Sequence, residues 1–306
     1  MGVIGIDTSN YTTSIAFFDG TGGENCSKLL PVKPGELGLR QSDAVFAHIK
    51  SLPELSGRLF SHVREEIRAV GVSTRPRAVE GSYMPCFLVG LSHAKLLSDA
   101  LHVPLVEVSH QQGHVAASLW SAGHLELMDE PHLAWHLSGG TTELLLVEPE
   151  GKLVNCTKIG GTTDISAGQL IDRTGQLLGL PFPSGKHLDA LSREAAGKDF
   201  FRVKCKDMTF SFSGMQNKVQ QYFEANGDPA ETAAYALRCV AYGVFHATQQ
   251  ALKAYPGLPV VFSGGVASNT LLRQVLEPLN PIFAQPQYST DNAMGVAVLA
   301  SRCTEV

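Results

Sequence analysis

The sequence predicts an α/β fold built from two related halves. A pattern of strand, polar turn and strand spans residues 2–20 and returns at 133–151, where the Thr-Thr pair at 141–142 aligns with the one at 12–13. Around these two hairpins, short apolar strands alternate with segments of helical periodicity, which is typical of α/β proteins. Duplication of one supersecondary unit at this separation indicates two structurally equivalent halves.

The first half begins with the hairpin, whose expected strand, turn and strand are 3–6, 7–13 and 14–18. Alternating apolar and β-branched residues bounded by polar turn residues predict each strand. The elements expected after the hairpin are an amphipathic helix at 42–69, a helix at 88–101 that ends before Pro104, a strand at 105–106, and a helix from the N-cap Ser109 to Trp120.

The second half repeats the hairpin, with strands at 133–137 and 144–147 around the turn 138–142. The elements expected after it are a helix at 164–178, an irregular Pro- and Gly-rich stretch at 179–186, a long helix at 228–254, a buried strand at 259–262, a Gly-rich turn at 263–265, a helix from Asn269, and a C-terminal helix at 293–302. We expect the first half to span residues 1–120 and the second to span 121–290 with a helical insertion. The C-terminal region 291–306 is expected to pack back on the first half.

Composition and charge narrow the class of protein. The chain has 306 residues, of which 44% are hydrophobic and 17% charged, and this balance excludes an intrinsically disordered protein. The formal net charge of −5 provides no global attraction to nucleic acid, so an RNA partner would need a local basic patch. The six cysteines contain no CxxC pair, which argues against a zinc knuckle or a disulfide framework. Without a signal peptide or an apolar run of about 18 residues, a cytoplasmic protein with no membrane partner is expected.

Three turns rich in Gly, Ser and Thr follow apolar strands, at 7–13, 138–142 and 263–265. Backbone N–H groups in such turns can bind phosphate oxygens. A single turn of this kind is more often only a tight turn, but three of them together with an internal repeat favour a nucleotide site between the halves. The stretch 179–186 is not a P-loop, because two prolines lie between its glycines and His187 follows the lysine where Ser or Thr belongs.

His110 and His114 lie four residues apart within Ser109-His-Gln-Gln-Gly-His114. On a helix this spacing places both imidazoles on one face, as a shared metal ion requires. The alternative is a pair of partly buried histidines that are satisfied by hydrogen bonds. A metalloprotease is excluded, because Gln111 stands where the general-base glutamate belongs and neither Gln111 nor Gln112 can take a proton from water.

Six motifs, in this order along most of the chain, resemble those of the universal tRNA threonylcarbamoyladenosine transferases, the TsaD family, once called O-sialoglycoprotein endopeptidases. The motifs are HQQGH at 110–114, LSGGTTEL at 137–144, LIDRTGQLLGLPFPSG within 160–189, FSFSG at 210–214, SGGVASN at 263–269 and TDNAMGVA at 290–297. Their number and order favour the metal-site interpretation of the two histidines over the alternative.

The resemblance implies an actin/hexokinase-like (ASKHA) ATPase fold, with two RNase H-like halves and a nucleotide and metal cleft between them. It also implies one metal ion held by His110, His114 and Asp291. Two nitrogens and one carboxylate oxygen suit iron or zinc. For Asp291 alone, the alternative is an N-cap of the C-terminal helix, and one side chain can serve both roles. The candidate catalytic residues are the two histidines and Asp7, which keeps the first carboxylate of the family's first turn.

The resemblance further implies an adenine nucleotide, either ATP or threonylcarbamoyl-AMP, with Mg²⁺ as a further candidate cofactor. The residues implied as its contacts are Ser138, Gly139, Gly140, Asp172, Gly185, Asp189, Gly264, Gly265 and Asn269. Among them, the turn 138–140 would contact phosphate, Asp172 and Asp189 would accept hydrogen bonds from ribose hydroxyls, and Asn269 would contact the adenosine. The alternatives are a surface charge for Asp172 and a cap or salt bridge for Asp189.

Several positions of the family motifs carry other residues in this chain. A first set replaces acids or a histidine: Tyr11, Thr12, Gln112, Thr141, Gly161, Ile165 and Gln169. In addition, residues 73–81 replace a compact glycine-rich turn, whereas Asp164 and Asp172 are kept. Because carboxylates near the reacting group can stabilise the transition state, these replacements favour retained binding over retained transfer.

Two hypotheses for function follow. The first is an enzyme that moves a threonylcarbamoyl group from threonylcarbamoyl-adenylate to N6 of adenine 37 in tRNA. The second is a nucleotide- and metal-binding paralogue without tRNA transferase activity, such as a slow ATPase, an enzyme for another acyl or carbamoyl substrate, or a regulatory partner. Small proteins of the threonylcarbamoyladenosine pathway, or a homo- or heterodimer, are expected partners. Candidate tRNA contacts, which are otherwise plain solvated charges, are Arg202, Lys204 and Lys206, with Arg64, Arg68, Arg75 and Arg77.

Overall fold

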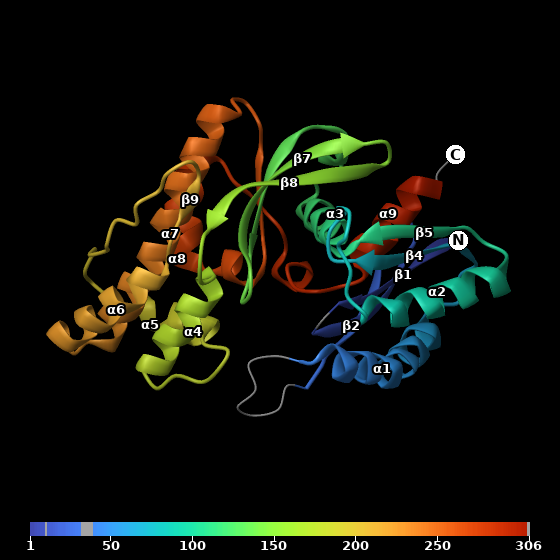
Figure 1. Ribbon diagram of the computed structural model, residues 1–306, viewed down its shortest axis with the longest axis horizontal. Coiled ribbons are helices and arrows are strands. Elements are labelled where there is room, and N and C mark those ends of the chain that lie inside the picture. Colours follow the sequence, from blue (N-terminus) through green and yellow to red (C-terminus); the bar gives the residue numbers. More distant parts are fainter. Residues whose placement is uncertain (10, 32–38, 305–306) are drawn as a thin grey trace. The chain divides into compact units, whose positions relative to one another are not determined.

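A computed structural model describes residues 1–9, 11–31 and 39–304 (Figure 1). The chain forms two compact units. The first comprises Met1–Glu130, Glu148–Cys156 and Gln287–Val306, and the second comprises Pro131–Val147 and Thr157–Pro286. Within the described ranges, no helix is both long enough and apolar enough to cross a bilayer.

A five-stranded sheet forms the centre of the first unit. Its strands are β1 (Gly2–Ser9), β2 (Thr12–Phe18), β3 (Gly23–Leu29), β4 (Ile67–Arg75) and β5 (Leu105–Ser109). Their order in the sheet is β3-β2-β1-β4-β5. The pairs β1–β2 and β2–β3 are antiparallel, whereas β1–β4 and β4–β5 are parallel. The carboxyl ends of β1, β4 and β5 therefore meet at one edge, which is the edge that carries the candidate metal site.

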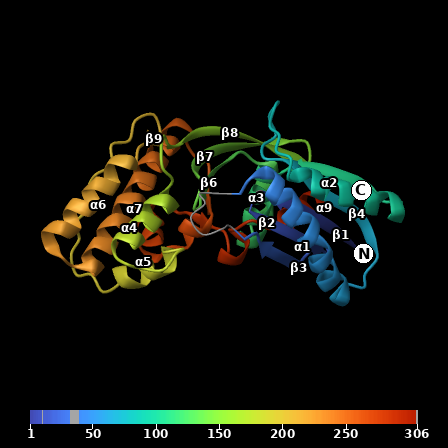
Figure 2. The same cartoon turned by 60° about the horizontal axis from the view of Figure 1, so that its bottom comes forward.

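Helices cover both faces of this sheet (Figures 1 and 2). They are α1 (Gln41–His62), α2 (Phe87–Leu101), α3 (His110–Ala122) and α9 (Met294–Thr304), with the short 3-10 helices η1 (Leu125–Asp129) and η4 (Pro286–Tyr288). Since successive strand residues point to opposite faces, Ile4 and Ile6 pack with Leu55 of α1 on one face. Val3 packs with Ala300 of α9 on the other face.

Glycines bring α9 unusually close to the sheet and to α3. A Cβ atom added at Gly5 of β1 would lie 2.4 Å from the carbonyl oxygen of Ala293, and one at Gly71 of β4 would also collide with α9. A Cβ atom at Gly295 would lie only 1.8 Å from the carbonyl oxygen of Gly113 in α3. Backbone packs directly on backbone at these contacts, and the start of α9 is thereby held beside α3.

The sheet of the second unit has six strands. They are β6 (His132–Leu137), β7 (Thr142–Glu150), β8 (Leu153–Thr162), β9 (Thr209–Phe210), β10 (Val260–Ser263) and β11 (Ile282–Phe283), in the order β11-β10-β6-β7-β8-β9. The order β8-β7-β6-β10-β11 matches β3-β2-β1-β4-β5 of the first sheet strand for strand. In both sheets the first two strands, β1 and β2 or β6 and β7, form an antiparallel hairpin. A later strand, β4 or β10, then pairs in parallel with the first strand of that hairpin. The predicted duplication is therefore confirmed.

The second unit also holds a large helical core. Its helices are α4 (Ala167–Leu177), α5 (Gly185–Ser192), α6 (Ser213–Asn226), α7 (Pro229–Ala254) and α8 (Thr270–Leu276), with η2 (Gly265–Ser268) and η3 (Glu277–Leu279). Figure 2 shows α4, α6 and α7 side by side, in agreement with their contacts. Asp228 caps α7 by accepting hydrogen bonds from the N–H groups of Ala230 and Glu231. The fully buried Trp135 donates its indole N–H to Thr248 of α7, which links helix and sheet.

Three expectations about the elements were wrong. The helix expected at 42–69 ends at His62, because Ile67–Arg75 is strand β4, whose β-branched residues pair with β1. The turn expected at 7–13 is mostly strand, since β1 runs to Ser9 and β2 starts at Thr12. Its Asn10 lies outside the described residues, as do 305–306 of the expected C-terminal region. The stretch 179–186 was expected to be irregular throughout, but its last two residues are helical, because α5 begins at Gly185.

Candidate functional site

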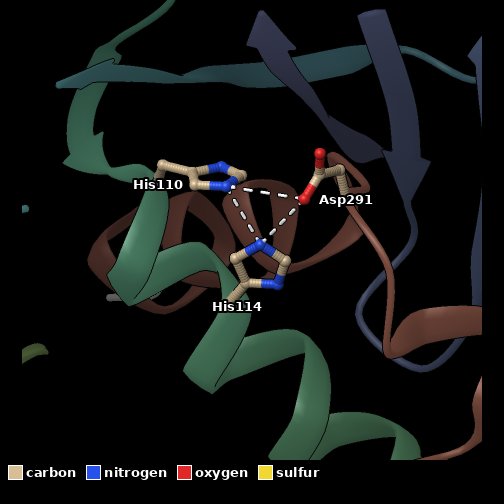
Figure 3. A group of neighbouring side chains, drawn as sticks. All are labelled: His110, His114 and Asp291. Atoms are coloured by element: carbon tan, nitrogen blue, oxygen red, sulfur yellow. Dashed lines mark hydrogen bonds and ion pairs between the residues drawn. The ribbon is translucent and has the colours of Figure 1, made fainter. Parts of the chain in front are cut away.

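The two histidines of the HQQGH motif open helix α3. Ser109 is the N-cap, as predicted, and its hydroxyl accepts a hydrogen bond from the N–H of Gln112. The Gln112 side chain in turn accepts from the N–H of Ser109, which completes a capping box. This cap fixes the first turn of the helix, so that His110 and His114 share one face. Their Nε2 atoms lie 3.0 Å apart (Figure 3).

Asp291 joins the histidines from a distant part of the sequence. Its Oδ1 atom lies 3.2 Å from Nε2 of His114 and 3.7 Å from Nε2 of His110. The three side chains point toward one another, and their donor atoms all lie within 4.8 Å (Figure 3). The contact between Gly295 and Gly113 explains why they meet, since Asp291 stands just before α9. The neighbouring Asn292 accepts a hydrogen bond from the N–H of Met294, the first residue of α9.

Asp7 contacts the ring of His110 at Nδ1, whereas His114 and Asp291 face Nε2. The Asp7 carboxylate is fully buried and accepts hydrogen bonds from Nδ1 of His110, at 2.9 Å, and from the Ser73 hydroxyl. Because a carboxylate can only accept here, Nδ1 carries a proton, and Nε2, the nitrogen that would bind a metal ion once deprotonated, faces His114 and Asp291. A carboxylate that orients a ligating histidine in this way is a common feature of metal sites. In this structure Asp7 holds the His110 ring in place.

The electrostatics of the cluster favour a cation. Burial alone would lower the pKa of His110, but the carboxylates of Asp7 and Asp291 outweigh burial and raise this pKa to about 9. A proton is therefore drawn to the space between the three side chains, and a divalent cation would meet the same attraction. Two imidazole nitrogens and one carboxylate oxygen form a three-ligand set that leaves positions open for a substrate or water. The residues present fit a divalent metal ion.

Two of the predicted phosphate-binding turns lie side by side in the second unit. Gly264 has a φ of +93°, and a Cβ atom there would lie 2.1 Å from the carbonyl oxygen of Leu137, so only glycine fits where the turn after β10 meets the end of β6. The space beside Gly139, Gly140 and Gly265 is open, because an added Cβ atom at each would meet nothing within 4 Å. The turn at 7–13 belongs to the first unit.

The other predicted nucleotide contacts lie on or near α4, α5 and α8. Asp172 accepts a hydrogen bond from the N–H of Ser184, and burial raises the pKa of its carboxyl group. Oδ1 of Asp189 accepts from the Asn269 side chain and from the N–H and hydroxyl of Thr270, while Oδ2 pairs with Arg193. The cap and salt bridge considered for Asp189 are thus both present. Gly185 begins α5, and a Cβ atom there would be unobstructed.

Several residues of the site were not predicted. Ser73 contacts Asp7, and the Ser9 hydroxyl lies 3.4 Å from Oδ2 of Asp291. Recognition of strand β4 in the sequence would have placed Ser73 beside β1. Asp164, a retained acid of the family motif, accepts hydrogen bonds from the N–H groups of Phe212 and Ser213 at the start of α6. Burial raises the pKa of its carboxyl group, but hydrogen bonds from the Ser211 and Ser213 side chains, together with these backbone bonds, lower it overall.

Three of the replaced family positions have structural explanations. Gln112 and Gln169 both occupy the third helical position of a capping box, where glutamate and glutamine are equally suitable. Gln112 also donates its amide N–H to the carbonyl oxygen of Val154, which a carboxylate could not do. Gly161 has a φ of +122°, and a Cβ atom there would lie 2.3 Å from the carbonyl oxygen of Thr142. These residues are explained by helix capping and by backbone conformation, so the absence of a charge at these positions says little about the reaction.

The basic residues considered for RNA are divided between the units. Arg202, Lys204 and Lys206 are exposed in the second unit. In the first unit Arg68 donates hydrogen bonds to Ser301 and Thr304 of α9, which gives it a structural role. The remaining candidates of that unit are Arg64, Arg75 and Arg77, of which Arg75 is half-buried and the others are exposed.

Comparison with known proteins agrees with this architecture. Solved structures similar in fold include full-length HypF in a phosphate- and nucleotide-bound form, with a TM-score of 0.62 and 15% identity. The similarity covers 100% of this chain, which spans 47% of the HypF chain. A ROK family glucokinase from Streptomyces griseus in complex with glucose and AMPPNP matches with a TM-score of 0.56 and 11% identity, over 99% of this chain and 100% of its own. The fold is therefore of the predicted actin/hexokinase-like class.

Sequence comparison identifies the family. The family model described as TsaD, tRNA N6-adenosine threonylcarbamoyltransferase, matches residues 40–298. A relative of that name from Carboxydothermus hydrogenoformans is 34% identical over 76% of this chain and 70% of its own length. Another from Thermosipho africanus is 30% identical over 97% of this chain and 92% of its own length. The chain belongs to the TsaD family of tRNA N6-adenosine threonylcarbamoyltransferases.

Proposed function

We propose that this protein transfers a threonylcarbamoyl group from threonylcarbamoyl-adenylate to N6 of adenine 37 in tRNA. In this reaction a bond forms between N6 and the carbonyl carbon, the bond from that carbon to the phosphate oxygen breaks, AMP leaves and one N6 proton is released. The observation that carries the proposal is the cluster of His110, His114 and Asp291 in a chain of this family.

The cluster is the proposed metal site, and iron or zinc suits its nitrogen and oxygen ligands. When bound, such an ion supplies Lewis-acid and template chemistry for a carbonyl or phosphate oxygen. The protein's own contribution is to hold the ligands in place before substrate arrives. Asp7 and Ser73 fix the ring of His110, while the packing of α9 on α3 fixes Asp291.

The second unit is proposed to bind the adenylate. Phosphate oxygens would be contacted by backbone N–H groups at Ser138, Gly139 and Gly140 and at the Gly264-Gly265 turn. The space beside Gly139, Gly140 and Gly265 is open for such a ligand. Asp172 is the better candidate for a ribose hydroxyl, since within the described part of the chain its carboxylate accepts one hydrogen bond, from the N–H of Ser184. Asp189 would act indirectly, by holding Asn269 and the start of α8.

Retained transfer is favoured over a binding-only role by the roles of the replaced residues. Gln112 and Gln169 close capping boxes, and Gly161 is required by its backbone, so no catalytic carboxylate needs to be missing at these positions. The acceptor is proposed to be tRNA, with Arg202, Lys204 and Lys206 as candidate phosphate contacts. Small partner proteins of the same pathway are proposed to assist.

The test is a transfer assay with metal-replete protein, threonylcarbamoyl-adenylate and unmodified tRNA, in which modified adenosine is measured by mass spectrometry. It should be run with the protein alone and again with a cell extract that lacks its own transferase. We expect modified adenosine in the second arm at least, and its loss with His114→Ala. An exposed variant, Lys95→Ala, is the matched control. Tight adenylate binding without product in either arm would refute the transferase proposal.

A further inference from the structure

A loop beside the first histidine lines an open hollow that has no role in the function proposed above. The loop runs from the end of β4, and its hollow of about 390 Å³ is lined by Arg75, Ala78, Val79, Glu80, Gly81 and Ser82. This volume lies within the range of small-molecule sites, about 300–1,000 Å³. In the sequence, the same residues stand where the family has a compact glycine-rich turn, so the hollow is a feature of this chain.

The loop is preformed and is anchored next to the metal site. Ser82 closes it from within, because its hydroxyl accepts a hydrogen bond from the N–H of Arg77 and its own N–H donates to the carbonyl of Val79. At its start, Arg75 pairs in register with Ser109. The carbonyl oxygen of Pro76 accepts a hydrogen bond from the N–H of Gln111, the residue after His110. The loop and the beginning of α3 are therefore held together, as Figure 1 shows for the segment that follows β4.

Arg75 supplies an uncompensated positive charge in this hollow. Its side chain is half-buried, and among the described residues it has no hydrogen-bond or ion-pair partner. Glu80 lines the same hollow and likewise has no partner within the described part of the chain. A half-buried guanidinium is well suited to bind a planar anion through two parallel hydrogen bonds.

We propose that this loop is the subsite for the threonyl end of the donor, with Arg75 binding its carboxylate and Glu80 accepting a hydrogen bond from its hydroxyl. The inference rests on the proposed function, because that function supplies the donor. The donor has two anionic groups, and of these the threonyl carboxylate is the planar one that suits a guanidinium. Glu80 disfavours a polyanion such as the tRNA backbone in this hollow, whereas a monoanion that also carries a hydroxyl donor suits one positive and one negative side chain.

Calorimetry with three non-reacting probes tests the subsite. The probes are AMP, a stable amide-linked analogue of threonylcarbamoyl-adenylate, and the same analogue with its carboxylate converted to a carboxamide. We expect the wild-type protein to prefer the carboxylate over the carboxamide by about 10- to 100-fold, as is usual for a hydrogen-bonded charged group. Arg75→Ala should reduce this preference to about twofold and leave AMP affinity unchanged. Arg75→Lys, which keeps the charge, should retain part of the preference.

Arg77→Ala is the matched control, because Arg77 is exposed in the same loop and does not line the hollow. It should retain the full preference for the carboxylate. Thermal unfolding of each variant checks that the loop substitution has not unfolded the protein. Since the Arg75 side chain has no partner among the described residues, no loss of stability is expected.

The outcomes separate this subsite from the proposed function. An undiminished preference in a folded Arg75→Ala protein would overturn the subsite and leave the transferase proposal standing. A fall in AMP affinity would show that Arg75 contacts phosphate, and a fall in tRNA affinity with the preference unchanged would show an RNA contact; either result overturns the subsite. If the wild-type protein bound the analogue no better than AMP, the donor itself, and with it the proposed function, would be wrong.

Discussion

The substitution Gly295→Ala tests whether backbone packing between α9 and α3 builds the metal site. The added Cβ atom would lie 1.8 Å from the carbonyl oxygen of Gly113, whereas a carbon and an oxygen atom normally stay about 3.3 Å apart. The helices must therefore separate by about 1.5 Å. Overpacking of this kind costs about 1–3 kcal/mol of folding free energy. The same movement would carry Asp291 away from the histidines, although metal–ligand distances tolerate changes of only about 0.2 Å.

Two measurements on the Gly295→Ala protein follow from this geometry. Denaturant unfolding followed by circular dichroism should show the loss of stability, and a zinc titration against a chromophoric chelator should show metal affinity reduced at least about 10- to 100-fold, the range seen when a supporting hydrogen bond is lost. Gly57→Ala is the matched control, because Gly57 lies exposed in α1 and its added Cβ atom would meet nothing within 4 Å. It should be neutral or stabilising by about 0.5–1 kcal/mol. If Gly295→Ala kept wild-type stability and metal affinity, the packing argument would be refuted.

Four further predictions concern single side chains. Asp291→Ala should lose the bound ion in elemental analysis, and full metal occupancy in the variant would contradict the three-ligand assignment. Folding raises the pKa of His110 from 6.5 to about 9, so protonated His110 stabilises the metal-free protein fully below pH 6.5, and this stabilisation is lost as the pH rises through 9. Metal affinity should rise over the same interval, because the ion competes with the proton. A metal affinity that does not depend on pH would contradict this assignment of His110. Gln112→Glu keeps the capping box but loses the hydrogen bond to Val154, so unfolding should show about 1–3 kcal/mol less stability at neutral pH, and an unchanged midpoint would show that this bond matters little. Asp172→Ala should bind AMP more weakly in calorimetry, and an unaltered affinity would remove the ribose role.

Local sequence patterns were sufficient for much of the fold. The two hairpins, the helix α3 and the long helix α7 follow from periodicity, and for α3 also from the N-cap residue Ser109. Such signals act over a few residues and do not depend on the rest of the chain. Where they conflicted, prediction failed, as at the junction of α1 and β4, where a helical pattern runs into a strand. Pairing with β1 decides that Ile67–Arg75 is a strand, and this contact is not local.

The candidate site shows the same division. The spacing of His110 and His114 was sufficient to place both on one helix face, and a family motif singled out Asp291. Neither pattern could show that Asp7 and Ser73 support His110, or that Gln112 is tied to Val154. These are contacts between side chains far apart in the sequence, so they exist only once the strands and helices have packed.

The sequence by itself therefore determined the duplicated α/β architecture, the two histidines on one helix and the family. Tertiary structure decided which distant groups meet. Glycines at 5, 71 and 295 let backbone approach backbone, and this close packing sets Asp291 beside the histidines. It also decided that Arg75 stands next to His110, because the parallel pairing of β4 and β5 brings their ends together. The physical reason is that helix and strand signals depend on neighbouring residues, whereas ligand geometry depends on how the whole core packs.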